Sequence, residues 1–222
     1  MTITTSALHR VAAIAASLAG LTYIVIQFVH PADVVASLAT QTWVTVHILS
    51  FGMAVLAMIG LAGIYLRQVR QVGILGLVGY LMFGFFFILQ AAFNFTEALV
   101  APLVAHDAPQ LAVDIVGLFG RYASVSDLGL LAGLPLLGSV LYVGGALLFG
   151  IAIIRGRVLS RGAGILLIVA AALTPAAGLL PHNIERMAAI PMGLALIWLG
   201  YSLFSDLRTS SAVPRLLQDV RN

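Results

Sequence analysis

The chain has 222 residues, of which 61% are hydrophobic and only 9% charged, with a formal net charge of +3 and a mean hydropathy of +1.10. Soluble domains carry about 25% charged residues, so this composition excludes a water-soluble globular protein and predicts a multi-pass membrane protein. The chain contains neither cysteine nor lysine, which excludes disulfides, thiolate metal sites, thiol nucleophiles and a retinal-type Schiff base.

Six segments are long and apolar enough to cross the hydrocarbon core, which takes about 20 residues of helix. In chain order they are residues 8–29, 41–66, 73–100, 130–154, 160–180 and 187–205. The apolar run of the first segment is too long for the core of a signal peptide, so we interpret it as a retained helix. The sequence therefore predicts an all-α bundle of six transmembrane helices over residues 1–205, with a cytoplasmic tail over 206–222.

The connection between the third and fourth segments predicts an amphipathic helix over about residues 108–122. Its apolar positions at helical spacing are Leu111, Ile115, Leu118, Phe119 and Tyr122, and its polar positions are Gln110, Asp114, Gly117 and Arg121. Such a helix is expected to lie in the outer membrane interface. Its simplest role is that of a connector; the alternative is a lid over the contents of the bundle.

The placement of the arginines predicts the orientation of the chain. Nine of the eleven lie on one side of the predicted membrane, and only Arg121 and Arg186 lie on the other. The positive-inside rule then places both termini in the cytoplasm. This pattern also explains the high pI of 9.7 without a nucleic-acid partner. Trp43, Trp198 and Tyr201 are expected in the interfacial aromatic belts.

Polar side chains follow one face of several predicted spans. Gln90, Asn94 and Glu97 stand at i, i+4 and i+7, which places them on one side of a helix. The other stripes are Tyr23, Gln27 and His30 in the first span, His47 and Ser50 in the second, and Ser139 and Tyr142 in the fourth. Since polar groups are costly in hydrocarbon, these faces should point at one another.

The stripes predict a polar pocket that opens to the outside. Its expected ligand-binding residues are Tyr23, Gln27, His30, His47, Ser50, Gln90, Asn94 and Glu97. Among them the ionisable His47 and Glu97 are the candidates for a direct role, since ionisable groups within a membrane mark functional sites.

Three chemistries fit these residues. His30, His47 and Glu97 are the ligand types of a two-histidine, one-carboxylate site for a divalent metal. His47 and Glu97 could instead act as catalytic base and acid on a lipid-soluble substrate, or relay protons during transport. A haem between two histidines is less favoured, because only His47 lies clearly inside a span.

Three functions stay open at this point. The first is a protein that binds a small or lipid-like ligand, with or without a metal. The second is a membrane-embedded enzyme that uses His47 and Glu97. The third is an accessory subunit of a homo-oligomer or larger membrane complex, in which the polar stripes only hold helices together. A proton-coupled transporter is disfavoured because the cytoplasmic halves of the spans are nearly free of polar groups.

Part of the chain resembles known sequences. The stretch LLFGIAIIRGRVLSRGAGILLIVAAAL (147–173), with TWVTVH (42–47) and FTEALVAP (95–102), is similar to uncharacterised small bacterial multi-pass membrane proteins in domain families of unknown function. The resemblance implies a helical bundle in a bacterial inner membrane. It implies no activity and no functional residues.

Overall fold

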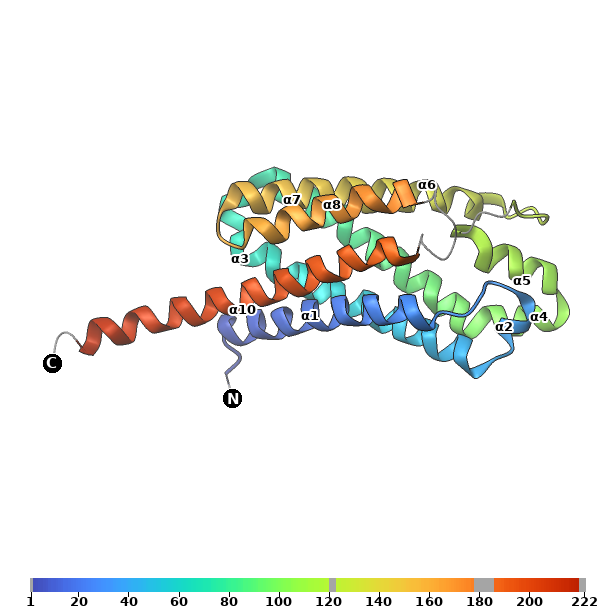
Figure 1. Cartoon of the computed structure of the whole chain (residues 1–222), viewed down its shortest axis with the longest axis horizontal. Helices are drawn as coiled ribbons and strands as arrows, with labels where there is room; N and C mark the ends of the chain where they lie inside the picture. Colours follow the sequence, from blue (N-terminus) through green and yellow to red (C-terminus); the bar gives the residue numbers. More distant parts are fainter. Residues whose placement is uncertain (1, 120–122, 178–185, 220–222) are drawn as a thin grey trace.

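The computed structural model describes residues 2–119, 123–177 and 186–219, and every regular element in these ranges is helical (Figure 1). The long helices are α1 (Thr5–Val29), α3 (Gln41–Phe95), α7 (Gly145–Gly156), α8 (Arg161–Ala177) and α10 (Ile190–Asp219). Shorter helices are α2 (Val35–Leu38), α4 (Ala101–Asp107), α5 (Pro109–Val116) and α6 (Leu134–Ser139). Helical turns of other pitch are η1 (Thr96–Val100), η2 (Gly117–Phe119), η3 (Gly129–Gly133), η4 (Val140–Gly144) and η5 (Arg186–Ala189). The predicted all-α fold is confirmed.

Four continuous helical stretches in the described residues are long and apolar enough to cross a membrane. They are Thr5–Val29, Gln41–Asp107, Gly129–Gly156 and Arg186–Arg208. The predicted span 160–180 corresponds to a shorter apolar helix, and its last three residues lie outside the described ranges. The last predicted span, 187–205, is the first part of a longer helix that continues to Asp219. The length and apolar composition of these helices indicate a membrane protein.

The stretch that begins at Gln41 covers two predicted spans because α3 is a hairpin of two helical arms. Two residues at the turn between the arms have non-helical backbone angles: Gln68 (φ −124°, ψ 15°) and Gly73 (φ 54°, ψ −152°). Glycine adopts the positive φ at residue 73 without strain. Tyr65 stacks on Tyr80 beside this turn, with ring centroids 4.8 Å apart. At the far end Phe51 lies against Phe95, which places the arms antiparallel.

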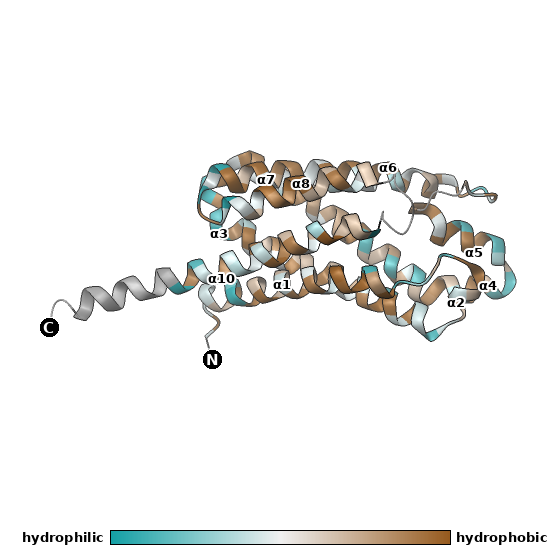
Figure 2. Cartoon of the chain, in the orientation of Figure 1, coloured by the Kyte–Doolittle hydropathy of each residue, from teal (hydrophilic) through white to brown (hydrophobic). Residues whose placement is uncertain are grey.

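Small residues bring the helix backbones close together. A Cβ on Gly60 would lie 2.7 Å from Cα of Ala16, and one on Gly79 would lie 2.8 Å from Cα of Phe149. The first arm of α3 thus packs on α1 and the second on α7, while α10 runs beside α1 (Figure 1). Apolar residues cover the outside of the bundle along its length (Figure 2), as expected for a surface that faces lipid.

A second, smaller core closes the end of the bundle that carries α2, α4 and α5 (Figure 1). It consists of the buried side chains of Leu38, Trp43, Ala101, Ala112 and Val116. The predicted helix 108–122 forms as α5 and η2, although Arg121 and Tyr122 lie outside the described residues. Its place in the membrane interface stays a prediction.

The predicted polar face of this segment was wrong at Asp114, which is buried with only 7% of its surface exposed. Its carboxylate accepts hydrogen bonds from the backbone N–H groups of Ser126 (2.7 Å) and Val125 (3.2 Å) and from Nε2 of Gln110 (2.9 Å). The hydrogen bonds with Ser126 hold the pKa of Asp114 below its usual value. Asp114 therefore fastens the following loop to α5.

We expect Gly79→Ala to lower the free energy of unfolding by about 1–3 kcal/mol, because the added methyl group collides with the backbone of Phe149. Gly84→Ala is the matched control, since no atom lies within 4 Å of the position that its Cβ would take and alanine favours the helix. Thermal unfolding of both variants in mild detergent measures the difference. Equal losses in the two variants would contradict the close approach of α3 and α7.

The Asp114 contacts predict a pH dependence for the loop that follows η2. Because the folded-state pKa is lowered, this stabilisation is complete above the unfolded value of about 3.9 and is lost as the pH falls through the folded value. Hydrogen-exchange protection of the Val125 and Ser126 amides should fall in acid, and Asp114→Asn should reduce it at neutral pH. Asp107→Asn is the control, because the Asp107 side chain is 86% exposed.

Candidate functional site

A cavity of about 700 Å³ lies where α1, both arms of α3, α5 and η5 come together. Seven of the eight predicted ligand-binding residues line it: Tyr23, Gln27, His30, Ser50, Gln90, Asn94 and Glu97. His47 is fully buried behind this lining and lies against Glu97. The structure thus brings the polar faces of the first three predicted spans around one space.

The stripe predicted in the fourth span does not reach this cavity as a whole. Ser139 is exposed on the outside of the bundle. Tyr142 is buried, and its hydroxyl lies 3.0 Å from Oγ1 of Thr174 on α8. Tyr23 packs against the core that includes Tyr142, so the fourth predicted span supports the cavity but contributes no lining residue of the predicted stripe.

The central contact of the site joins His47 to Glu97. Nε2 of His47 lies 3.6 Å from Oε2 of Glu97, and the two side chains are 1% and 10% exposed. Nδ1 of His47 lies 2.8 Å from the backbone oxygen of Trp43, which can only accept, so this nitrogen carries the donated proton. Nε2 has no hydrogen-bond partner. It faces the carboxyl group of Glu97.

The backbone around Glu97 has an unusual form that follows from Pro102. Residues Thr96–Val100 form a π-helical turn, in which the N–H of Ala101 donates to the oxygen of Thr96. Pro102, the next residue, has no N–H to offer. The carbonyl oxygen of Glu97 is therefore left without a backbone donor from its own helix.

Trp43 supplies the missing donor. Its Nε1–H donates to the oxygen of Glu97 at 2.7 Å, across 54 residues of sequence. The indole ring also lies on the His47 ring, with centroids 4.1 Å apart, and meets the His30 ring edge-on at 6.1 Å. One side chain thus positions both members of the central contact.

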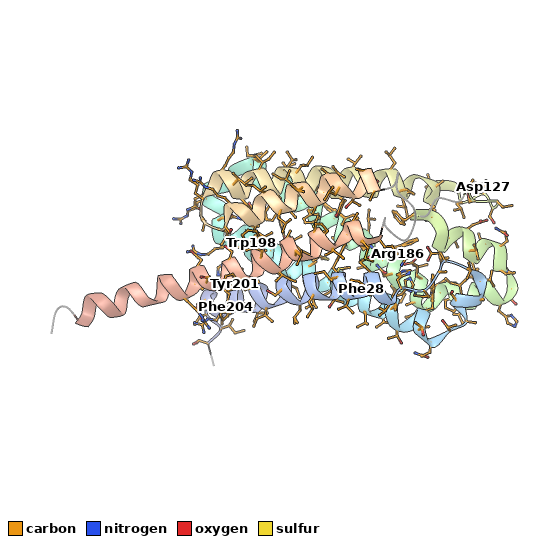
Figure 3. The ribbon with its side chains drawn as sticks, viewed as in Figure 1. Phe28, Asp127, Arg186, Trp198, Tyr201 and Phe204 are labelled. Atoms are coloured by element: carbon orange, nitrogen blue, oxygen red, sulfur yellow. The ribbon has the colours of Figure 1, made fainter. Side chains whose placement is uncertain are left out.

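The prediction that Trp43 belongs to an interfacial belt was wrong, because its exposed fraction is 0%. A signal in the sequence could have shown this, since Trp43 stands four residues before His47 and shares its helix face. Trp198 and Tyr201 are 43% and 66% exposed and lie along α10 toward the other end of the molecule (Figure 3), so the belt stays a prediction for them.

An ion pair that the sequence analysis missed lies on the wall of the cavity. Nη2 of Arg186 is 3.9 Å from Oδ2 of Asp33, and both residues line the cavity. Arg186 stands at the start of the segment that leads into α10, toward the end that carries α2, α4 and α5 (Figure 3). The sequence indicates only that both charges lie on the outer side, and no spacing connects two residues so far apart along the chain.

Aromatic rings form much of the remaining wall. Phe86, Phe93 and Phe119 line the cavity with Tyr23. Phe119, on η2, meets the edge of Phe93 at 4.9 Å between centroids. The segment predicted as a connector therefore contributes wall to the cavity, as its alternative interpretation as a lid requires.

The predicted metal ligands do not form a site in this arrangement. Among the described residues no group of three or more His, Cys, Asp or Glu side chains lies close enough to hold a metal ion. Nδ1 of His30 lies 2.7 Å from the backbone oxygen of Pro31 and Nδ1 of His47 lies 2.8 Å from that of Trp43, so only the Nε2 atoms would remain as ligands. In this structure His30, His47 and Glu97 do not form a group that could hold a metal ion.

Comparison of the chain with known protein families, with curated proteins and with solved structures finds no match in any of the three. The site must therefore be interpreted from its own geometry.

We expect Trp43→Phe to lower the free energy of unfolding by about 1–3 kcal/mol, because it leaves the buried Glu97 carbonyl without a donor. Trp198→Phe is the matched control, and as a partly exposed position it should change the free energy by less than about 0.5 kcal/mol. Thermal or denaturant unfolding in detergent provides the comparison. Equal effects would show that the indole N–H does not hold the π-helical turn.

Proposed function

We propose that this chain binds a small, lipid-like ligand in the cavity between α1, α3 and α5. The observation that carries the proposal is the cavity itself, whose volume of about 700 Å³ falls within the usual range for ligand pockets. Its wall combines aromatic rings with a few polar groups, which suits a ligand with an apolar body and one polar end.

The membrane arrangement that we propose has six spans with both termini in the cytoplasm of a bacterium. The antiparallel arms of α3 support two spans in place of one, since a straight helix of 55 residues would be about 80 Å long and the hydrocarbon core is about 30 Å thick. The start of α1 and the end of α10 lie at the same end of the molecule (Figure 1), which fits an even number of crossings.

The polar lining supports binding over a purely structural role. Nε2 of Gln27 donates to the oxygen of Tyr23, Nδ2 of Asn94 to that of Gln90, and Oγ of Ser50 to that of Val46. Each of these bonds stays within one helix. These side chains therefore do not join helices to one another, which is what a subunit held together by its polar stripes would need.

A second candidate function is an enzyme that uses His47 and Glu97 as base and acid. The 3.6 Å approach of Nε2 to the carboxyl oxygen favours it, because it places a proton acceptor beside a group that can hold a proton. Only Glu97 lines the cavity, so it would meet a substrate first. Chemical change of a bound lipid would distinguish this function from binding alone.

The test of binding is native mass spectrometry of the full chain released from mild detergent. We expect a retained lipid-like mass, and at least about tenfold weaker retention in Gln90→Trp, whose larger side chain fills the cavity. Phe85→Trp is the matched control, because Phe85 lies on the same arm of α3 and is 54% exposed. Bare protein under all gentle conditions, or equal retention in both variants, would overturn the proposal.

A further inference from the structure

The polar lining of the cavity offers hydrogen-bond acceptors to a ligand. Nε2 of Gln27 and Nδ2 of Asn94 each donate one N–H to a backbone oxygen of their own helix, which leaves the other N–H and the side-chain oxygen of each amide. The hydroxyl of Ser50 donates to its own helix, which leaves its oxygen as an acceptor. A ligand with hydrogen-bond donors or positive charge can use these oxygens.

The pair of His47 and Glu97 has the same requirement. With Nδ1 donating to Trp43, the lone pair of Nε2 points toward a carboxyl oxygen at 3.6 Å. Two acceptors in a buried space repel each other unless a proton or another positive charge accompanies them. Before a ligand binds, the pair must therefore hold one proton more than a neutral imidazole and a carboxylate do.

The fixed charges of the wall disfavour an anionic ligand. Of the described lining residues, Arg186 alone is a permanent cation, and it is 3.9 Å from the carboxylate of Asp33. An anion would have to compete with Asp33 for Arg186 and would then meet Glu97. A cation can instead use the carboxyl of Glu97 and the faces of Tyr23 and Phe86, since aromatic faces attract ammonium groups.

We propose that the ligand is an amphipathic organic cation of the alkylammonium type, and that it enters the cavity in exchange for a proton that the pair of His47 and Glu97 carries. One positive charge enters and one proton leaves to solvent, so the charge of the site is unchanged. This inference rests on the proposed function and specifies its ligand class.

Exchange makes binding depend on pH, with tighter binding of the cation at higher pH. The titratable and charged groups that face Glu97 come from each element around it: His47 from the first arm of α3, His30 and Asp33 from the end of α1 and the loop after it, and Arg186 from η5. Asp33 and Arg186 carry opposite charges side by side. The pair of His47 and Glu97 therefore supplies the exchangeable proton.

The test uses Trp43 as a reporter in the full chain carrying Trp198→Phe, which removes the only other tryptophan. The indole lies on the His47 ring, so proton loss or occupation of the cavity changes its emission. The probes are decyltrimethylammonium, whose charge does not change with pH, and 1-decanol and decyl sulfate, which share its chain. We expect the cation to bind most tightly, with up to about tenfold gain in affinity per pH unit while the pair titrates.

Variants then assign the effect. Glu97→Gln should weaken binding of decyltrimethylammonium at least about tenfold and remove its pH dependence, while binding of 1-decanol changes by much less. Asp206→Asn is the matched control, because it makes the same change in a carboxylate bound to Arg67, away from the cavity. It should leave both probes unchanged.

The results separate this inference from the proposed function. If 1-decanol or decyl sulfate binds as tightly as the cation, the proposed exchange of a cation for a proton is overturned. It is also overturned if the cation binds to the parent chain without pH dependence. In both cases the proposal of a lipid-binding cavity is unaffected. If none of the three amphiphiles alters Trp43 emission and native mass spectrometry also shows bare protein, both proposals are overturned.

Discussion

The hydrogen bond from Trp43 to the backbone oxygen of Glu97 is the constraint on which the end of the molecule that carries α2, α4 and α5 depends. It exists because Pro102 lacks an N–H and the Ala101 N–H turns to Thr96, which leaves one buried carbonyl to be satisfied from outside the helix. Its partner comes from the opposite arm of α3, so the bond closes the hairpin at the end away from its turn. The second core, which includes Leu38 and Ala112, then packs around the same indole. This bond fixes the backbone of Glu97, while the His47 ring is oriented by its own bond to the Trp43 backbone oxygen and by the indole ring against it.

The cavity lies at this end because the character of α1 changes along its length. Its first turns carry Ala12, Ala16 and Ala19, which are buried and allow neighbouring backbones to approach closely. Beyond Gly20, larger side chains such as Tyr23 and Ile26 face the interior, and the distance between packed helices grows with the side chains between them. The space that opens is lined by polar groups that are already bonded to their own helices. The helices are widely separated here, and their polar side chains are hydrogen-bonded within their own helices, so a cavity remains between them. More closely packed helices would have allowed these side chains to bond to one another.

Helical periodicity was enough to predict the all-α fold and the faces that surround the cavity, because Gln90, Asn94 and Glu97 keep their common face whatever packs against it. The reversal of α3 near Gly73 could also be predicted, since the two arms are separately long enough to cross a membrane. Features that depend on a distant partner could not. The polar spacing of Asp114 suggested solvent, yet its carboxylate turns inward because the amides of Val125 and Ser126 need an acceptor. No local sequence pattern predicts the ion pair between Arg186 and Asp33. Trp43 was wrongly predicted at the interface because an aromatic residue near the end of a span suits an interface as well as a buried site.

Helices pack tightly at the end where α1 begins and enclose a cavity at the other end. This difference bears on whether the protein could be a carrier. A route from the cavity to the end where α1 begins would have to separate α1 from both α3 and α10. Those helices meet backbone to backbone: Gly60 lies on Ala16, and Gly20 lies on Gly193 with no room for a methyl group between them. Contacts of this kind have many atoms at van der Waals distance and few polar groups to bond with water along an opened path. The polar lining, in contrast, ends with the cavity. The packing therefore supports the proposal of a binding protein over that of a carrier, because no loosely packed route leads from the cavity to the end where α1 begins.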